Sequence, residues 1–247
     1  MRSGRQELGA LGAVPREGPL GGLWELLFPS RCLGCGQRGM LLCTDCRPTV
    51  PWLPADVCPR CAARSSGGRV CRRCAGSGAR RHLASVRAAC TFDGVVRTAI
   101  HHLKFRQARY MASLLAQMLA DGLVRRPINA DLVLPVPLSP SRHRERGYNQ
   151  SELIAFAVER LGHLPAPLPG SLTRVRDTRP QVGLPAAERL RNLGGAFRCE
   201  APELVAGRRC LLIDDVMTTG ATLEACAEPL AQAGAERILA LVVAREF

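Results

Sequence analysis

The sequence predicts an α/β fold in which a parallel sheet is flanked by helices, preceded by a small cysteine-rich module. Three observations support this prediction. Strand-like apolar segments alternate with helix-like segments throughout residues 86–247, as they do where helices connect parallel strands. Eight of the twelve cysteines lie between positions 32 and 74. At 247 residues, the chain is long enough for one sizeable core and one small module.

Composition divides the chain into three parts. We expect residues 1–22 to form a disordered leader, because this segment lacks the continuous apolar run of a secretory signal. Residues 23–80 contain the cysteine-rich module, and residues 86–247 form the α/β domain. The longest apolar run, at 238–244, has seven residues, which is too short to span a membrane. We therefore expect a cytoplasmic protein that does not insert into membranes.

The eight clustered cysteines form four C-x-x-C pairs: Cys32/Cys35, Cys43/Cys46, Cys58/Cys61 and Cys71/Cys74. Two such pairs make a tetrahedral thiolate site, which usually binds zinc. Few apolar residues lie here, so zinc would stabilise the folded module, by about 10–16 kcal/mol per site. Disulfides are disfavoured in a cytosolic chain, and four regularly spaced pairs favour structural sites over a redox motif. We expect two zincs, with each pair joined to its neighbour in sequence because this closes shorter loops than an interleaved arrangement.

Basic residues concentrate in the N-terminal third. The formal net charge is +13, of which residues 1–90 contribute +9 (14 basic, five acidic) and residues 91–247 contribute +4 (20 basic, 16 acidic). Eight arginines and no acid lie between positions 56 and 93. The cluster indicates either a surface for a polyanion or a solvated basic face. Two four-thiolate zinc sites would lower the N-terminal charge to about +5.

The remaining cysteines show no paired spacing, and we expect them to be core residues: Cys90, Cys199, Cys210 and Cys226.

The α/β domain begins with a strand at 86–92, a turn at 93–94 and helices at 95–103 and 110–123. Neither His101 nor His102 is interpreted as a metal ligand, because adjacent residues do not share a helix face. Lys104 is the sole lysine, and it is either a phosphate contact or an ordinary surface residue.

A buried strand is expected at 131–138, with two prolines at its carboxyl end, where open α/β sheets bind ligands. The segment that follows predicts a cationic loop, and its arginines Arg142, Arg144 and Arg146 suit phosphate oxygens. A solvated loop is the alternative.

Ser151 is expected to cap a helix at 152–161. One face of that helix is expected to be apolar and to comprise Leu153, Ile154, Phe156, Ala157 and Leu161.

Residues 164–195 are rich in proline and arginine and have weak periodicity. Such a long connection between α/β elements indicates a mobile active-site loop. Its polar residues Arg174, Arg176, Arg179 and Gln181 suit closure over a polyanion. Strands at 196–199, 210–213 and 238–244 are expected to complete the sheet.

Residues 210–222 combine a strand, the acidic pair Asp214 and Asp215, and a turn of small residues at 218–222. A helix follows at 223–233, with Pro229 expected to bend or interrupt it and Gly234 to end it. A helix that starts after such a turn offers an anion site. A P-loop NTPase is excluded because no lysine lies in the required context, and the absence of G-x-G-x-x-G after a strand disfavours a dinucleotide fold.

Residues 210–222 resemble the phosphoribosyl pyrophosphate (PRPP) motif of type I phosphoribosyltransferases. The wider layout resembles the ComF family of competence-associated proteins, and the resemblance covers about residues 24–247. It rests, in order, on the four cysteine pairs, H-x-L-K-F at 101–105, R-x-R-G-Y-N-Q at 144–150 and R-x-R-D-T-x-x-Q at 174–181, with Arg189, Arg191 and Asn192. It implies a double zinc ribbon followed by a type I phosphoribosyltransferase-like domain.

The resemblance also implies roles for individual residues. Asp214 and Asp215 would hold the ribose hydroxyls of PRPP, and Mg²⁺ would bridge pyrophosphate and ribose. The 5′-phosphate would be held by Thr218, Thr219, Gly220, Ala221 and Thr222. The pyrophosphate would be met by Arg142, Arg144 and Arg146, and Lys104 would reach a phosphate. Carboxylates near the sugar ring would stabilise positive charge at the anomeric carbon, while Mg²⁺ and the arginines stabilise the leaving pyrophosphate.

Two functions remain open at this point. The first is an enzyme that transfers a phosphoribosyl group to a nitrogen acceptor, which the intact acidic pair favours. The second is a non-catalytic protein that binds PRPP or handles single-stranded DNA during DNA uptake, with the basic zinc module touching the DNA. The association of similar proteins with competence favours the second. The acceptor base is not indicated by the sequence.

Overall fold

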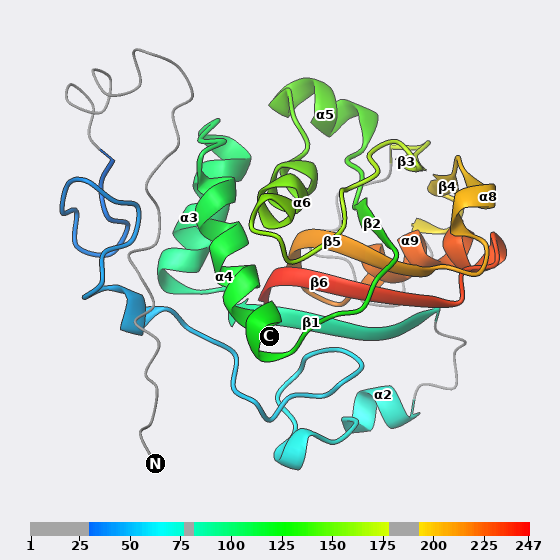
Figure 1. The fold of residues 1–247 in the computed structure, drawn as a ribbon, viewed down its shortest axis with the longest axis horizontal. Coiled ribbons are helices and arrows are strands. Elements are labelled where there is room, and N and C mark those ends of the chain that lie inside the picture. The colour runs from blue at the N-terminus through cyan, green and yellow to red at the C-terminus, as the bar shows by residue number, and fades with distance from the viewer. Residues whose placement is uncertain (1–29, 77–81, 178–192) are drawn as a thin grey trace.

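A four-stranded parallel sheet forms the centre of the molecule (Figure 1). The structure is a computed structural model, and it describes residues 30–76, 82–177 and 193–247. The strands lie in the order β1-β6-β5-β2 and comprise β1 (Leu83–Thr91), β6 (Arg237–Arg245), β5 (Arg209–Met217) and β2 (Leu132–Pro135). Because β5 and β2 are neighbours, the chain that follows each of them emerges at the same edge of the sheet. The predicted parallel sheet is confirmed.

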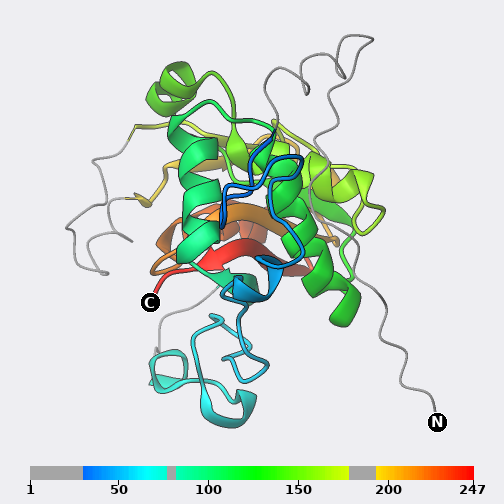
Figure 2. The same ribbon diagram turned by 90° about the vertical axis from the view of Figure 1, so that its left-hand side faces the viewer.

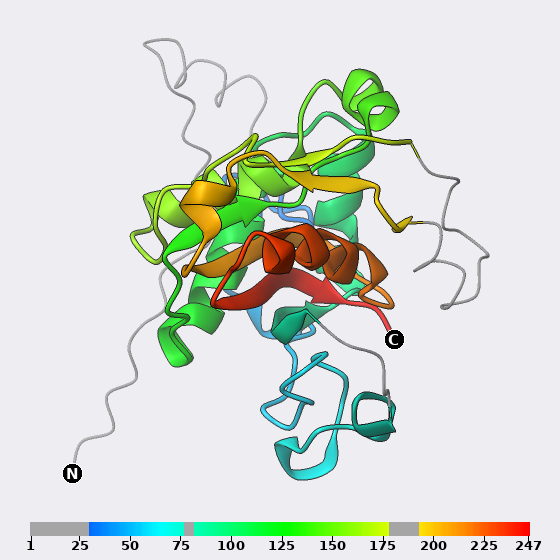
Figure 3. The same cartoon turned by 90° about the vertical axis from the view of Figure 1, so that its right-hand side faces the viewer.

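Helices cover both faces of the sheet (Figures 1 and 3). One face carries α3 (Gly94–Phe105), α4 (Met111–Arg125) and α6 (Gln150–Arg160), and the other carries α9 (Ala221–Gln232). Strand alternation explains this division. Leu211 and Ile213 of β5 belong to the core under α3, α4 and α6, whereas Cys210 and Leu212 belong to the core under α9.

Two cysteine-rich ribbons pack on different parts of this domain (Figure 2). The first ribbon, residues 30–50, ends in η1 (Arg47–Thr49) and lies against α3 and α4, where Leu41 and Leu42 are fully buried. Arg47 pairs with Asp121 of α4 at 2.7 Å. The second ribbon, residues 57–76, contains η2 (Ser66–Gly68) and α2 (Arg72–Gly76). Its cysteines Cys58, Cys61 and Cys74 share a core with β1, β6 and α9.

The segment after β2 is a helix, so the expected loop at 139–146 is wrong. The helix is α5 (Pro140–Arg146). The side chain of Ser139 accepts a hydrogen bond from the Arg142 N–H, Pro140 occupies the first turn, and Gly147 ends the helix with φ 74°. These are ordinary start and stop signals for a helix.

The next helix, α6, is capped by Asn149 rather than by Ser151, because the Asn149 side chain accepts from the Ser151 N–H. The expected apolar face is also rotated. Ile154, Ala155 and Val158 are buried, whereas Phe156 and Leu161 are exposed.

The strand expected at 196–199 does not join the parallel sheet. It is β4 (Phe197–Cys199), and it pairs antiparallel with β3 (Leu172–Arg174) in a separate two-stranded sheet. Pro167 and Leu168 lie along the outer edge of β2, where the Leu168 N–H donates to the Val133 carbonyl. That edge is therefore already covered. The short helix α8 (Pro202–Val205) then leads to β5.

Several further expectations are corrected or limited by the structure. β5 runs through the acidic pair to Met217, and α9 continues past Pro229 without interruption. Among the unpaired cysteines, Cys90, Cys210 and Cys226 are buried as expected, whereas Cys199 is only half-buried. The expected leader at 1–22 and the part of the long connection at 178–192 lie outside the described residues. In the described part of the chain, no helix is both long and apolar enough to cross a bilayer.

Candidate functional site

The acidic pair lies near the carboxyl end of β5, next to the carboxyl end of β2. Asp214 is buried, and its Oδ1 accepts hydrogen bonds from Ser151 Oγ and from the Asp215 N–H, both at 2.9 Å. Burial, reinforced by the neighbouring charge of Asp215, raises the pKa of Asp214 to about 7. The carboxyl group is therefore poised between its protonated and ionised forms near neutral pH.

Asp215 is paired on one side only. Its Oδ1 lies 2.9 Å from Lys104 Nζ, so the sole lysine, on α3, reaches the acidic pair. Its Oδ2 is buried and has no hydrogen-bond partner within the described residues. A buried carboxylate oxygen without a partner is costly. A ligand hydroxyl or a cation would supply the missing partner, so this atom fits the ribose or Mg²⁺ that the motif implies.

The turn after β5 has the geometry of an anion site. Gly220 adopts φ 85°, which strongly favours glycine, and serves as the N-cap of α9 without a side-chain cap. Thr219 Oγ1 accepts from the Ala221 N–H at 3.3 Å. The first turn of α9 therefore directs backbone N–H groups toward the space beyond the sheet edge.

The three arginines of α5 occupy different positions. Arg146 is half-buried and close enough to Asp215 for their charges to interact. Its guanidinium donates to Gln150 Oε1 and lies 5.7 Å from the centre of the Phe105 ring. Burial lowers the pKa of Arg146, and Asp215 opposes that shift. Arg142 and Arg144 are exposed. The structure therefore brings Arg146 to the acidic pair and leaves the other two on the outer surface of α5.

The long connection approaches α5 through Asp177, which accepts from Ser141 Oγ at 2.7 Å. Arg174 and Arg176 are on this side of the molecule: Arg174 stacks on Phe197 at 5.4 Å, and Arg176 donates to the Gly194 carbonyl at 2.7 Å. The other two residues expected to close over a polyanion, Arg179 and Gln181, lie outside the described residues, as do Arg189, Arg191 and Asn192 of the family resemblance.

Two residues of the R-x-R-G-Y-N-Q segment hold the site's elements together. The Tyr148 hydroxyl donates to the Leu103 carbonyl at the end of α3. The Asn149 side chain donates to the Val136 carbonyl just after β2, at 3.0 Å. Lys104 and Arg146 are thereby fixed in position relative to the sheet.

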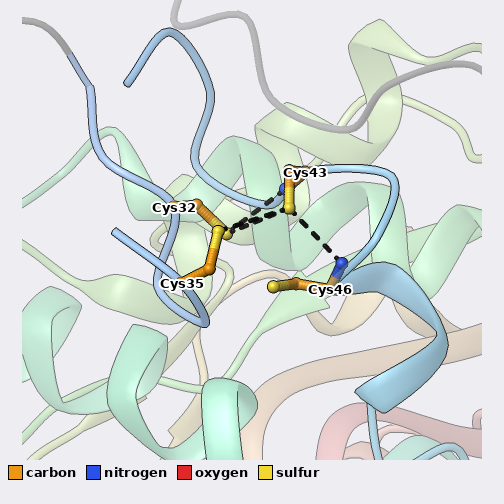
Figure 4. Close-up of side chains that lie close together, drawn as sticks. All are labelled: Cys32, Cys35, Cys43 and Cys46. Atoms are coloured by element: carbon orange, nitrogen blue, oxygen red, sulfur yellow. Dashed lines mark hydrogen bonds between the residues drawn. The ribbon is translucent and has the colours of Figure 1, made fainter. Parts of the chain in front are cut away.

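The cysteine pairs form two compact clusters, each of four sulfurs within 4.8 Å of one another: Cys32, Cys35, Cys43 and Cys46; and Cys58, Cys61, Cys71 and Cys74. The pairing is therefore sequential, as expected. Figure 4 shows the first cluster, in which Cys43 Sγ lies 3.6 Å from the sulfurs of both Cys32 and Cys35. A tetrahedron with zinc–sulfur bonds of 2.3 Å has sulfurs about 3.8 Å apart, so the geometry fits zinc.

Backbone groups prepare the sulfurs for metal. Burial opposes ionisation of Cys32, but N–H groups around it, including those of Cys43 and Gly34, outweigh burial and lower the pKa of Cys32 to about 6. Neighbouring sulfurs, Cys43 first, raise the pKa of Cys46 to about 12. Four thiols this close together need a cation before all of them ionise. At Gly34, a Cβ atom would lie only 2.7 Å from Cys46 Sγ, so glycine is required for the knuckle to close.

Sequence reasoning missed three residues that the structure connects to the site: Ser151, Arg73 and Arg245. Ser151 was expected to cap a helix, and it donates to Asp214 instead. Arg73 of α2 donates to the Thr219 carbonyl at 3.0 Å. Arg245 is only 4% exposed and donates to the carbonyls of Cys61 and Met217. For Arg245, the one signal in the sequence was its position as a charged residue directly after the apolar strand 238–244.

Comparison with known proteins gives matches to both parts of the chain. Residues 23–75 match the double zinc ribbon domain, and residues 143–246 match the phosphoribosyl transferase domain. The first match supports the assignment of the two four-cysteine clusters as zinc-ribbon sites.

Curated relatives carry names related to DNA use and competence. The DNA utilization protein YhgH of Escherichia coli K12 is 38% identical over 144 residues, which cover 56% of this chain and 62% of that protein. Competence protein ComFC of Bacillus subtilis is 28% identical over 198 residues, covering 78% and 79%. Competence protein F of Haemophilus influenzae is 37% identical over 116 residues, covering 47% and 50%. The chain thus spans less than two thirds of the length of its YhgH relatives.

Proposed function

We propose that this chain, which matches a double zinc ribbon domain followed by a phosphoribosyl transferase domain, binds PRPP with Mg²⁺ and transfers the phosphoribosyl group to a nitrogen acceptor. The observation that carries the proposal is the buried acidic pair. Asp214 is held by Ser151, and Asp215 by Lys104. Both lie directly before a turn whose Gly220 opens a helix N-terminus.

Each part of the site has a task in this proposal. Asp214 and Asp215 accept hydrogen bonds from the ribose 2′- and 3′-hydroxyls. Asp215 Oδ2, which has no hydrogen-bond partner in the described part of the chain, is one of the acceptors. The turn at 218–222 holds the 5′-phosphate through backbone N–H groups and threonine hydroxyls. Arg146 faces the pyrophosphate, with Arg142 and Arg144 further out on α5.

The proposed reaction is a displacement at the anomeric carbon. The bond from this carbon to the pyrophosphate oxygen breaks, the acceptor nitrogen forms a new bond to the same carbon, and the nitrogen loses its proton. The two carboxylates stabilise the positive charge that develops on the sugar ring. The arginines stabilise the departing pyrophosphate. Mg²⁺, when bound, would neutralise charge on the pyrophosphate and help to hold it in place.

Titration calorimetry with PRPP and Mg²⁺ tests the binding step. We expect a dissociation constant between micromolar and millimolar for the wild type. The double variant Asp214→Asn/Asp215→Asn should bind at least about tenfold more weakly, because charge-assisted hydrogen bonds are lost. Asp45→Asn, at an exposed carboxylate on the first ribbon, is the matched control. A wild-type protein that gives no heat with PRPP would exclude this function. A screen of nucleobases for pyrophosphate release would identify the acceptor.

A second candidate function, the handling of single-stranded DNA, is favoured by a row of cationic and aromatic side chains. Arg97, His101 and Phe105 lie on the exposed stripe of α3. The centre of the Phe92 ring lies 5.8 Å from Arg97 Cζ and 6.0 Å from the centre of the His101 ring. At the other end of the row, the Arg146 guanidinium stacks on the Phe105 ring. Phe105 is 66% exposed. Exposed rings beside cations suit unpaired bases and phosphates. The names of the relatives agree with such a role, and a reducing cytoplasm would preserve the eight zinc-site thiols.

Binding of fluorescent single-stranded DNA at several salt concentrations tests the second candidate. Phe105→Ala should weaken binding about fivefold or more through lost stacking, whereas Phe156→Ala, at an exposed ring on α6, should not. If the basic second ribbon takes part as well, Arg64→Gln and Arg69→Gln should each reduce the salt slope by about 0.7. Both ribbons share the domain's core, so these point variants are preferable to deletion of the ribbons. No difference between Phe105→Ala and Phe156→Ala would count against the row as a DNA surface.

A further inference from the structure

The second zinc ribbon reaches the back of the proposed phosphate turn. Arg245, the last residue of β6, is buried between the two. Its Nε donates to the Cys61 carbonyl of the ribbon at 3.2 Å. Its Nη1 donates to the Met217 carbonyl at 2.9 Å and also to the Thr218 carbonyl. A single guanidinium therefore joins a zinc knuckle to the first peptides of the turn.

A second arginine extends this connection by one peptide. Arg73 lies on α2, between the ligands Cys71 and Cys74, and its Nη2 donates to the Thr219 carbonyl at 3.0 Å. The carbonyls of three successive residues, 217 to 219, are thus all bonded by arginines that the second ribbon carries or contacts. Arg245 lies close enough to the Cys61 and Cys71 sulfurs for its charge to be stabilised by them.

The direction of these hydrogen bonds matters for anion binding. A trans peptide is planar, and its C=O and N–H point in opposite directions. When the carbonyls of Met217, Thr218 and Thr219 point back toward the arginines, the N–H groups of the same three peptides point away from the ribbon. They belong to Thr218, Thr219 and Gly220, the residues that lead into the N-terminus of α9. Preorganised N–H groups bind an anion without the cost of reorienting the loop.

We propose that the second zinc ribbon preorganises the phosphate turn through Arg245 and Arg73, so that zinc at the second site and PRPP at the turn strengthen each other's binding. This inference rests on the proposed function, because it takes the 5′-phosphate of PRPP as the anion. Arg245 and Arg73 are positioning residues: they contact the back of the turn, not the ligand. The first ribbon has no such connection within the described residues, since its arginine anchor, Arg47, bonds to Asp121 on α4.

Substitution of the two arginines gives the first test. Arg245→Lys keeps a positive charge, but a single ammonium replaces the guanidinium that donates to both the ribbon and the turn. We therefore expect the affinity for PRPP–Mg²⁺ to fall about tenfold. Arg73→Gln should lower it about threefold, since the residue is exposed. Arg72→Gln, the adjacent exposed arginine on the same helix, should leave affinity unchanged. Ribose 5-phosphate, which lacks the pyrophosphate, should show the same order of effects.

Zinc affinity in the wild-type protein gives the second test, and it does not depend on any variant folding. Because coupling between two ligands is reciprocal, saturating PRPP–Mg²⁺ should raise the affinity of one of the two zincs about tenfold in competition with a chromogenic chelator. The effect should be lost in Arg245→Lys and retained in Arg47→Gln. If Arg245 only stabilised the fold, PRPP–Mg²⁺ would not change the affinity of the protein for zinc.

The outcomes separate the inference from the proposed function. PRPP that fails to bind the wild type overturns both. The inference alone is overturned if PRPP binds the wild type, Arg245→Lys and Arg73→Gln with equal affinity and changes the affinity of neither zinc. An equal effect of PRPP on both zincs overturns the assignment to the second ribbon.

Discussion

PRPP binding should depend on pH through Asp214. Burial and the neighbouring Asp215 raise the pKa of Asp214 to about 7. With that pKa, about one tenth of the groups are ionised at pH 6 and about nine tenths at pH 8. The ionised form is the acceptor for ribose hydroxyls and the partner for Mg²⁺. Affinity should therefore be about tenfold higher at pH 8 than at pH 6, and it should be lost as pH falls through 7.

Calorimetric titrations at half-unit pH intervals measure this dependence, with the variant Asp214→Asn as the reference. The 5′-phosphate of PRPP also titrates near pH 6, but it contributes equally to both proteins. The difference between the two profiles therefore isolates Asp214. At pH 8 the variant should bind about tenfold more weakly than the wild type, and at pH 6 the two should nearly coincide.

Ser151 provides an independent check on the assignment. Its hydroxyl donates to Asp214 Oδ1 at 2.9 Å, and this hydrogen bond favours the ionised carboxylate. Ser151→Ala should therefore move the midpoint of the pH profile upward. Parallel profiles for wild type and Asp214→Asn across pH 6–8 would refute the reasoning, because they would mean that Asp214 does not change its ionisation on binding.

Three other predictions concern the zinc sites and the ion pair. Metal analysis should find two zincs per chain, and a value below one would reject both ribbon sites. Gly34→Ala should reduce the zinc content to about one, since its Cβ would lie 2.7 Å from Cys46 Sγ; full occupancy would show that the knuckle adjusts. Lys104→Met should lower stability in urea by about 3 kcal/mol, because it leaves the buried Asp215 without its cation. The second change Asp215→Asn should recover part of that loss, and no recovery would argue against the pair as the cause.

The sequence contained enough to predict the layered α/β fold and the zinc pairing, because both follow from local patterns. The spacing of the C-x-x-C pairs limits which sulfurs can meet, and the acidic pair comes at the end of an apolar strand next to a small-residue turn. The structure bears out the grouping of the cysteines. The start and stop of α5 were also present as Ser139, Pro140 and Gly147. Interpreting that segment as a cationic loop gave too much weight to its arginines.

The residues that could not be predicted are those whose partners lie far away in the chain. Ser151 donates to a carboxylate 63 positions later, and Arg245 donates to a carbonyl 184 positions earlier. Periodicity and capping rules concern neighbours within about one helical turn or one strand, so they contain no information on such contacts. The position of Lys104 beside Asp215 belongs to the same class, and only the resemblance to a family pointed to a role for this residue.

The two zinc ribbons pack in the cores on opposite faces of the sheet, and each face contributes different residues to the candidate site. Alternation along β5 places Asp215 on the side of Leu211 and Ile213, in the core that includes Cys32 and Cys43 of the first ribbon. It places Asp214 on the side of Leu212, in the core that includes the second ribbon's cysteines and the start of α9. The first ribbon packs on α3, which carries Lys104, and the second ribbon backs the phosphate turn. Each face of the sheet therefore contributes to the candidate site and has one ribbon in its core, and Ser151 of α6 links Asp214 to the face that carries the first ribbon.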